Sequence, residues 1–335
     1  MAATRENPVI NSQYLQPQHE WGWQVALYLY LAGMGAGATM MGLLADWLGY
    51  SPYASRAILL WGPLMVGVGA LFLLLKLGIK RRFMNTVMNP MTSWLSRGFY
   101  ILSVCILAGT AILAISLAPL VGIDVDGLST TTSVLNIVVF IFSLATAVYT
   151  GILIQAVKYV SFWHTYMLPV LFTVSALSTG AVATLLVTQI YDLAMFEKGY
   201  STQMAGILMN TEQILMVIEL VVLGLFLYGR YKAQEGQARS SVLLLMFGKY
   251  RLVFWLGIVG CGFIFPLILE NFNSMFAENA FLLYAAFACV LTSGLLLRMG
   301  IIYSGIKDQT PLHKAVEMQY FLKFEDTGTI PLRME

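Results

Sequence analysis

Two charged residues lie inside long apolar runs of the sequence. Glu219 interrupts the run near 208–229, and Arg298 interrupts the run near 280–305. If both runs are helices, each residue lies roughly 15 Å from the same membrane surface, at about 1.5 Å per residue. A charge at that depth costs free energy and usually indicates a function or a partner. Equal depth makes the two residues candidates for one buried ion pair. Such a pair has either a purely structural role, in which the two charges neutralise each other between helices, or a role in proton transfer or ligand binding.

Hydroxyl, imidazole and guanidinium groups form a second candidate group toward that same surface. Tyr149 lies deeper in its apolar run than an interfacial belt of aromatic residues, so its hydroxyl needs a partner inside the protein. Tyr28 lies near the start of the first run, and Ser93 and Arg97 lie at the entry to the third. His164 precedes the fifth run. We expect these side chains to converge on a polar pocket close to the membrane surface.

The sequence offers no ligands for a redox centre of its own. A bis-histidine haem needs paired histidines within spans, but the histidines lie at or outside the ends of the apolar runs, at His19, His164 and His313. The cysteines stand singly within apolar runs, without CxxC spacing, at Cys105, Cys261 and Cys289. We therefore expect no haem and no iron–sulfur cluster in this protein. If the protein does redox chemistry, its electrons come from another subunit.

The composition identifies the elements that must position these residues. Hydrophobic residues make up 59% of the sequence and charged residues 11%, and the mean hydropathy is +0.76. Soluble proteins carry about 25% charged residues, so this is an integral membrane protein. We expect membrane lipid around it and no nucleic acid among its partners.

Eight apolar runs are long enough to cross a bilayer, which takes roughly 20 residues. They lie near 24–46, 57–79, 94–118, 133–157, 166–190, 208–229, 250–270 and 280–305. The runs are too long and too continuous for the alternating pattern of an outer-membrane barrel. The sequence therefore predicts an all-α integral membrane protein with eight transmembrane helices.

Charge separates the connections between these runs. The termini and three connections share one side, which carries the basic clusters at 80–82, 158 and 230–251, whereas the opposite connections are mainly acidic. The positive-inside rule then predicts a multi-pass protein of the cell inner (plasma) membrane with both termini in the cytoplasm. A basic surface that docks an acidic partner subunit is the alternative explanation.

A weak internal repeat suggests two halves of the same topology. The runs near 24–46 and 166–190 both contain a central tract of small residues and are followed by an acid, Asp46 or Asp192. We predict a cytoplasmic N-terminal segment (1–23), two four-helix bundles (24–157 and 158–305) and a cytoplasmic C-terminal tail (306–335), with the bundles related by an axis along the membrane normal.

Four passages together resemble the NrfD/PsrC family, the membrane subunits of polysulfide-reductase-like respiratory complexes. They are WGWQVALYLYLAGMGAG, NPMTSWLSRG, YTGILIQAVKYVSFWHTYMLPVLFTVSALSTG and LLLRMGIIYSGIKDQ. Their order and spacing extend the resemblance from Trp21 to Gly305. The resemblance implies two four-helix bundles that bind a quinone, either menaquinone or ubiquinone, as an exchangeable substrate. It also implies a ferredoxin-like iron–sulfur subunit as the neighbour, which exchanges electrons with a catalytic subunit such as a molybdopterin enzyme.

The resemblance also assigns roles to residues. Tyr149 of the YTG segment matches a quinone-contacting tyrosine in the family's YPG segment, and Tyr28 stands where a relative has a histidine that lines the site. A phenol can also donate a hydrogen bond to a quinone carbonyl. Tyr30 lies about 200° around the helix from Tyr28, so both rings cannot enter one pocket, and we predict that Tyr28 faces the quinone. The predicted quinone-binding residues are Tyr149, Tyr28, His164, Arg97 and Ser93, and the predicted proton-transfer or buried polar network is Glu219 and Arg298.

In the polysulfide reductase relative the catalytic module faces the outside, whereas the charge bias here indicates a cytoplasmic partner. The alternatives to a quinone subunit are a secondary transporter built from two parallel repeats and a purely structural anchor for a soluble enzyme. Against the transporter, no pair of runs is broken by glycine and proline at corresponding midspan positions. Against the anchor, eight helices exceed what anchoring requires.

Overall fold

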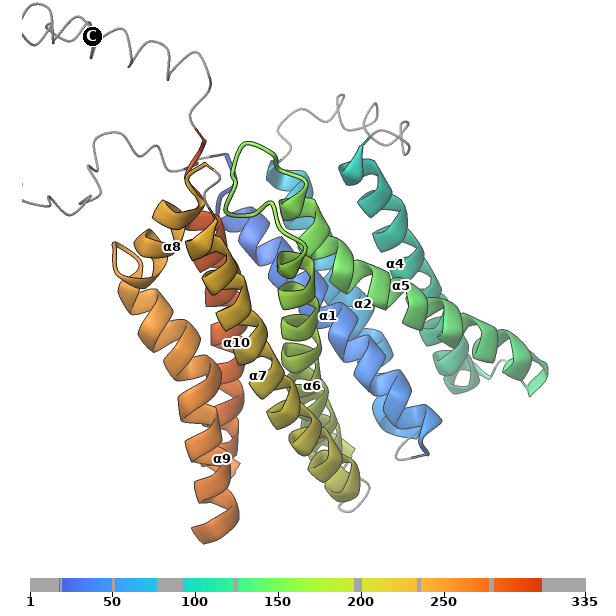
Figure 1. Ribbon diagram of the computed structural model, residues 1–335. Coiled ribbons are helices and arrows are strands. Elements are labelled where there is room, and N and C mark those ends of the chain that lie inside the picture. The colour runs from blue at the N-terminus through green and yellow to red at the C-terminus, as the bar shows by residue number, and fades with distance from the viewer. Residues whose placement is uncertain are drawn as a thin grey trace, which may run out of the picture.

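The structure is a computed structural model that describes residue 18 and residues 20–49, 52–76, 93–122, 126–195, 201–233, 236–276 and 280–308. The regular elements of these residues are all helical (Figure 1). The long ones are α1 (Trp23–Trp47), α2 (Pro52–Lys76), α4 (Trp94–Leu117), α5 (Ser129–Gln155), α6 (Met167–Met195), α7 (Ser201–Lys232) and α10 (Ala280–Tyr303). The others are η1 (Ala118–Val121), η2 (Asp126–Leu128), α8 (Ala238–Met246), η3 (Val253–Ile264) and α9 (Phe265–Phe276).

The prediction of an all-α membrane protein is confirmed. Among the described residues, 7 helices are long and apolar enough to cross a membrane: α1, α4, α5, α6, α7, α10 and the continuous pair η3 and α9. The remaining long helix, α2, has 25 residues, but its apolar part, Trp61–Lys76, falls in the class of shorter helices. The eighth span therefore stays a prediction.

Two features of the second half of the protein were not predicted. The first is the nine-residue helix α8, whose inner face buries Ala238, Ser241, Val242 and Leu245. The second is the π-helical start of the seventh run, η3, which packs on α10. There the Ser293 hydroxyl of α10 donates a hydrogen bond to the carbonyl of Ile258, at 3.1 Å. When a side chain bonds to a backbone carbonyl of a neighbouring helix, it can change the local pitch of that helix. The spacing of apolar residues in the sequence does not report such a change.

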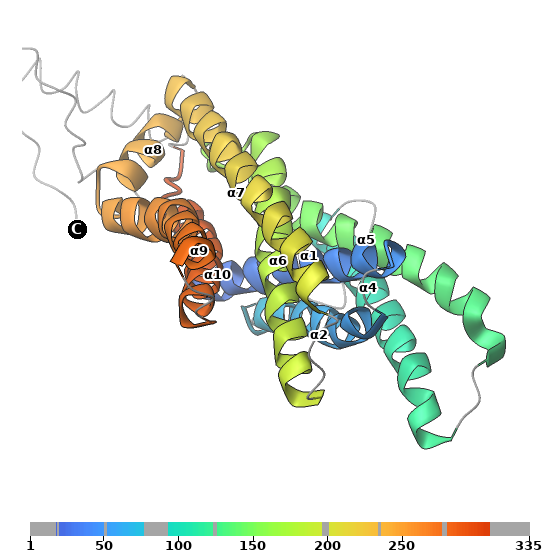
Figure 2. The same ribbon diagram turned by 90° about the horizontal axis from the view of Figure 1, so that it is seen from below.

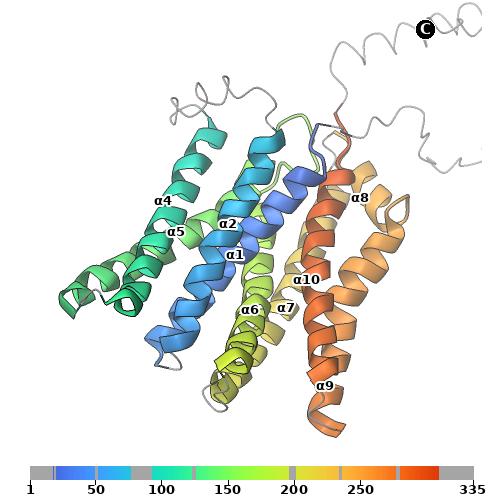
Figure 3. The ribbon, with the colours of Figure 1, turned by 180° about the vertical axis from the view of Figure 1, so that it is seen from behind.

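Helix α1 lies at the centre of the helix array. It contacts α2 and α5 from the first half of the sequence and α6 and α10 from the second half. Figure 3 shows α1 between α2 and α10, and Figure 2 shows α4 and α5 at one end of the array with α9 and α10 at the other. The helices of both halves are thus assembled around α1.

Small residues let α1 and α6 touch through their backbones. A methyl group on Gly37 would overlap the carbonyl of Ala176, and one on Gly180 would overlap the backbone of Gly37. The Thr184 hydroxyl of α6 also reaches the carbonyl of Ala38, at 3.3 Å. Close approach of this kind provides packing energy in lipid, where no hydrophobic effect drives helices together.

We call the side of the membrane on which α1 begins and α10 ends the near side. Polar contacts hold the chain segments on this side together. Lys307 lies 2.8 Å from the Glu20 carboxylate, and the Tyr159 hydroxyl donates to the other Glu20 oxygen at 2.7 Å. These two donors lower the pKa of Glu20, Lys307 having the larger effect. Burial raises the pKa of Tyr159 to about 12, and its bond to Glu20 adds to that rise.

A second group of contacts ties the near-side connections to one another. The Asp308 carboxylate accepts hydrogen bonds from the backbone N–H groups of Ser161, at 3.0 Å, and Gln237, at 2.8 Å. Arg230 donates to the carbonyl of Ser161 at 3.1 Å. The entry to α6, the entry to α8 and the exit from α10 therefore form one connected surface.

We predict that Gly37→Ala lowers the thermal stability of the detergent-purified protein. The added methyl group meets backbone rather than a movable side chain, and overpacking of this kind costs about 1–3 kcal/mol. Gly224→Ala on α7 is the matched control, because nothing lies within 4 Å of a methyl group there. Equal melting temperatures for the two variants would contradict the assigned α1–α6 contact.

Candidate functional site

Two buried tyrosines from different helices, here called the phenol pair, form the core of the site. Tyr28 of α1 is 0% exposed and Tyr149 of α5 is 2% exposed. The two phenols interact electrostatically, so they lie near one another. Neither hydroxyl has a hydrogen-bond partner within the part of the protein that the structure describes. The structure thus brings Tyr28 and Tyr149 together, as predicted from the sequence.

Two unpartnered phenol hydroxyls are unusual inside a protein. A buried hydroxyl without a partner costs about 1–3 kcal/mol, and each phenol O–H can both donate and accept. A ligand carbonyl or hydroxyl within hydrogen-bond distance of both oxygens would satisfy them. The phenol pair is therefore suited to binding a polar group of an otherwise apolar molecule.

Glycine at position 98 shapes the wall behind Tyr149. A methyl group on Gly98 of α4 would overlap the ring and the hydroxyl of Tyr149. The sequence pattern selected the neighbouring Arg97, but that side chain is exposed, with its guanidinium 4.6 Å from the ring centre of Trp94. One residue turns a helix by about 100°, so when Gly98 faces Tyr149 the side chain of Arg97 does not. The role of Gly98 depends on how α4 packs against α5. A sequence pattern does not report that packing, so the pattern missed this residue.

The structure does not bring Ser93 and His164 to the phenol pair. Ser93 is the residue before α4, half-buried, and its side chain makes no capping hydrogen bond. His164 is exposed on the near side in the connection between α5 and α6. Its Nδ1 lies 3.0 Å from the carbonyl of Gln155 at the end of α5.

Arg298 forms a second buried polar group on another side of α1. The side chain is 0% exposed, and its Nη1 donates to the Ser175 hydroxyl and to the Gly294 carbonyl, both at 2.8 Å. The guanidinium also lies 5.7 Å from the ring centre of Tyr30 and 5.4 Å from that of Phe172. Tyr30 thus faces Arg298, as expected if it diverges from Tyr28.

Glu219 joins this group through serines rather than by a direct ion pair. Its carboxyl is buried beside the hydroxyls of Ser175 and Ser178 and interacts electrostatically with Arg298. Among the described residues, however, the ion pair within 4.0 Å is that of Glu20 and Lys307. The expectation of a direct Glu219–Arg298 pair is therefore wrong. The reason is that α6 packs against both α7 and α10, which puts Ser175 between the two charges.

Two further buried carboxyl groups extend this network toward the far side, and the sequence pattern missed both as site residues. Glu212 lies two turns before Glu219 on α7, is 1% exposed, and neither of its oxygens has a partner among the described residues. Glu270 of α9 is 3% exposed and accepts a hydrogen bond from Gln213 at 2.9 Å. The seven-residue spacing of Glu212 and Glu219, which puts both on one helix face, was the available signal.

These groups interact pairwise, each with the next one along a line through the membrane. Glu212 interacts electrostatically with Glu270 and with Glu219, and Glu219 interacts with Arg298. We call Glu270, Glu212, Glu219 and Arg298 the buried polar series. Ionisable residues inside membrane spans commonly belong to proton relays or ion pathways.

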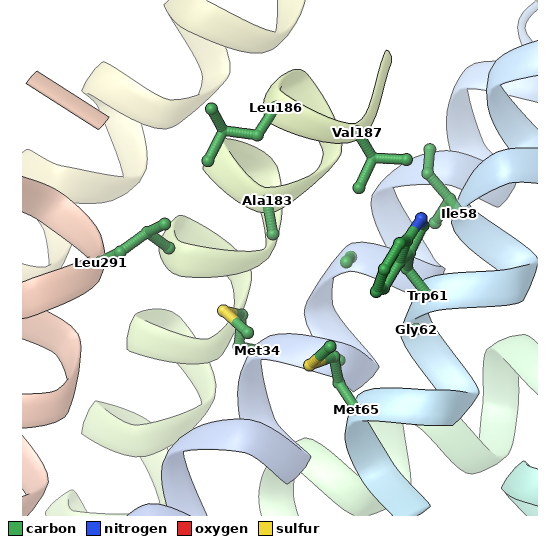
Figure 4. A pocket seen from close by; sticks show the side chains of 11 residues that line it. Met34, Ile58, Trp61, Gly62, Met65, Ala183, Leu186, Val187 and Leu291 are labelled. Atoms are coloured by element: carbon green, nitrogen blue, oxygen red, sulfur yellow. The ribbon is translucent and has the colours of Figure 1, made fainter. Parts of the chain in front are cut away.

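An apolar cavity of about 170 Å³ lies between α1, α2, α6 and α10 (Figure 4). Its lining includes Met34, Trp61, Met65, Val187 and Leu291. Apart from the Trp61 indole, the side chains drawn there carry no nitrogen or oxygen (Figure 4). The cavity can hold a hydrocarbon tail, but it lacks the polar groups that would orient a ligand headgroup.

Comparison with known proteins gives matches over most of the sequence. The family model described as polysulphide reductase, NrfD, matches residues 12–308. The C subunit of polysulfide reductase from Wolinella succinogenes is 26% identical over 312 residues, which cover 85% of this protein and 94% of that subunit. Protein NrfD of Escherichia coli is 29% identical over 307 residues, which cover 85% of this protein and 94% of the relative. The NrfD homolog of Haemophilus influenzae is 24% identical over 318 residues, with 86% and 95% covered.

Proposed function

Because this chain belongs to the NrfD polysulphide reductase family, whose members are membrane subunits of respiratory oxidoreductase complexes, we propose that it binds a quinone or quinol. In this role it exchanges electrons between the membrane quinone pool and an iron–sulfur partner. The observation that carries the proposal is the phenol pair, Tyr28 and Tyr149, buried and without hydrogen-bond partners among the described residues.

The chemistry of the phenol pair matches the polar part of a quinone. A quinone carbonyl accepts hydrogen bonds and a quinol hydroxyl donates them, and a phenol can serve either partner. Tyr28 and Tyr149 can therefore hold both redox states of the substrate without changing their own charge. Gly98 leaves the space that the Tyr149 ring occupies, so it acts as a positioning residue.

We propose that electrons reach the quinone from a ferredoxin-like iron–sulfur subunit bound on the near side. That subunit in turn exchanges electrons with a catalytic subunit such as a molybdopterin enzyme. The support for the near side is that polar contacts of Glu20, Asp308 and Arg230 fix the connections there into one surface. Arg97 and His164 are exposed toward this side, which makes contact with the partner a better role for them than contact with the quinone.

Quinone reduction takes up two protons along with two electrons, and we propose that the buried polar series moves protons. Ser175 receives a hydrogen bond from Arg298 and lies beside Glu219, so it connects the two charged groups. Glu212 and Glu270 continue the series toward the far side. In this proposal Glu219 and Arg298 have the proton-transfer role that their depth in the sequence suggested.

The proposed arrangement in the membrane is eight spans in two four-helix bundles, 24–157 and 158–305, with both termini in the cytoplasm. Helices α1, α2, α4 and α5 make contacts within the first half, and α6, α7, η3, α9 and α10 make contacts within the second, while α1 and α5 also pack on α6 and join the two halves. The near side carries exposed Lys76, Lys158 and Lys232, as the positive-inside rule requires of a cytoplasmic face.

We predict that Tyr149→Phe and Tyr28→Phe each raise the quinone KM about tenfold or abolish turnover, because each removes one hydrogen bond to the headgroup. The measurement is quinone-dependent electron transfer by the complex purified with its native partners. Tyr284→Phe, at a half-exposed position on α10, is the control. Unchanged quinone kinetics in both site variants, with the complex assembled, would remove the phenol pair from the quinone site.

We predict that Glu219→Gln lowers kcat by about tenfold or more while the quinone KM stays near its original value, since the change removes a proton carrier and leaves the headgroup contacts in place. A larger solvent deuterium isotope effect on kcat should accompany it. Glu219→Asp, which keeps a carboxyl group at this position, serves as control and should keep more of the activity. If Glu219→Gln raises KM alone, the residue binds substrate and the proton role fails.

We predict that a green fluorescent protein fused to the C-terminus is fluorescent and that alkaline phosphatase fused at the same position is inactive. Both outcomes follow from a cytoplasmic C-terminus. The opposite pair of results would put the near side outside and would overturn the orientation.

A further inference from the structure

The end of α7 and the start of α8 carry a cation–aromatic cluster that the quinone role does not use. We call Tyr228, Tyr231, Lys232 and Arg239 the basic corner. Lys232 lies 4.6 Å from the ring centre of Tyr228, and the Arg239 guanidinium lies 4.8 Å from that of Tyr231. Arg239 also donates a hydrogen bond to the Tyr231 hydroxyl at 3.2 Å. These contacts hold the two cations next to aromatic faces and turned outward.

The basic corner continues an apolar stripe on the outer face of α7. Val221, Leu225 and Tyr228 are 56%, 50% and 58% exposed, and they lie on one helix face with Lys232 at the next position. Figure 2 shows α7 along an edge of the helix array with α8 beside its end. Since α7 is long and apolar enough to cross a membrane, this stripe meets hydrocarbon and the cations above it lie at the depth of lipid headgroups.

Among the described residues, Lys232 and Arg239 make their contacts with aromatic rings and a phenol hydroxyl, whereas two neighbouring near-side cations are engaged by oxygen acceptors of the protein. Lys307 has Glu20, and Arg230 donates to the backbone carbonyls of Ser161 and His164. In the part of the protein that the structure describes, no carboxylate lies within 4.0 Å of Lys232 or Arg239. The inner face of α8 is buried, which fixes the position of Arg239 on the outer face.

We propose that the basic corner binds the phosphate of an anionic phospholipid, whose acyl tail lies along the Val221–Leu225–Tyr228 stripe. The guanidinium of Arg239 offers a planar fork to the phosphate oxygens and Lys232 adds a point charge. Clusters of cations directly beside a span attract anionic lipid in this way. A soluble acidic protein matches the charges but not the apolar stripe that continues from them.

The test uses the full-length protein purified with its native partners, and vesicles of phosphatidylcholine alone or mixed with phosphatidylglycerol. We expect the wild-type complex to retain phosphatidylglycerol through purification, as counted by native mass spectrometry, and to melt at a higher temperature when that lipid is added. The double variant Lys232→Gln, Arg239→Gln should bind it roughly 10–30-fold more weakly.

The matched control is Lys76→Gln, Lys158→Gln, which removes the same charge from exposed positions on the same side. Equal lipid binding by the two double variants would overturn the site. Binding of inorganic phosphate or of soluble glycerophosphoglycerol as tight as that of the lipid would overturn the lipid assignment. Lipid retention that appears only after the partner subunits are removed would show that a protein covers the corner.

A single variant keeps the test decisive if the double variant does not fold. Arg239→Lys keeps the charge and loses the guanidinium fork, so it should weaken phosphatidylglycerol binding by a smaller factor than the loss of charge does. Unchanged binding by Arg239→Lys and by Arg239→Gln would exclude Arg239 from the site. The quinone kinetics of both variants should match the wild type, which separates this inference from the proposed function.

Discussion

Backbone contact between α1 and α6 is the constraint on which both polar sites depend. Gly37 and Gly180 leave no side chain between the two helices, so their spacing is set by main-chain atoms that cannot adapt. Helix α1 carries Tyr28 and Tyr30, and α6 carries Ser175. This close contact therefore sets where Tyr28 and Tyr30 on α1 lie relative to Ser175 on α6.

The two sites differ in how many of their buried polar atoms have hydrogen-bond partners. Around Arg298, serine and carbonyl oxygens from two helices accept hydrogen bonds, and aromatic faces from α1 and α6 lie beside the guanidinium. At the phenol pair, both hydroxyls remain without a protein partner among the described residues. An unfilled hydrogen-bonding position inside a span is costly in lipid, where no water replaces the missing partner. The Arg298 side chain is thus partly satisfied, since its Nη1 donates two hydrogen bonds while its Nε and Nη2 have no partner among the described residues, whereas the two phenol hydroxyls have none at all there.

The sequence predicted the helices well because a span depends on long apolar runs, which composition reports directly. It also predicted that Glu219 and Arg298 lie near each other and that Tyr28 and Tyr30 diverge, because both follow from the regular geometry of a helix. It failed where the outcome depends on a neighbouring helix. Ser175 between two charges is decided by which helices are neighbours. So is the contact of Gly98 with Tyr149.

Helix α1 contributes a side chain to both polar sites. Tyr28 and Tyr30 project from it in nearly opposite directions, one toward the phenol pair and the other toward Arg298. Two residues apart on a helix pinned through Gly37, they move as parts of one rigid body. A shift of α1 would therefore change the surroundings of the phenol pair and of the Arg298 guanidinium together.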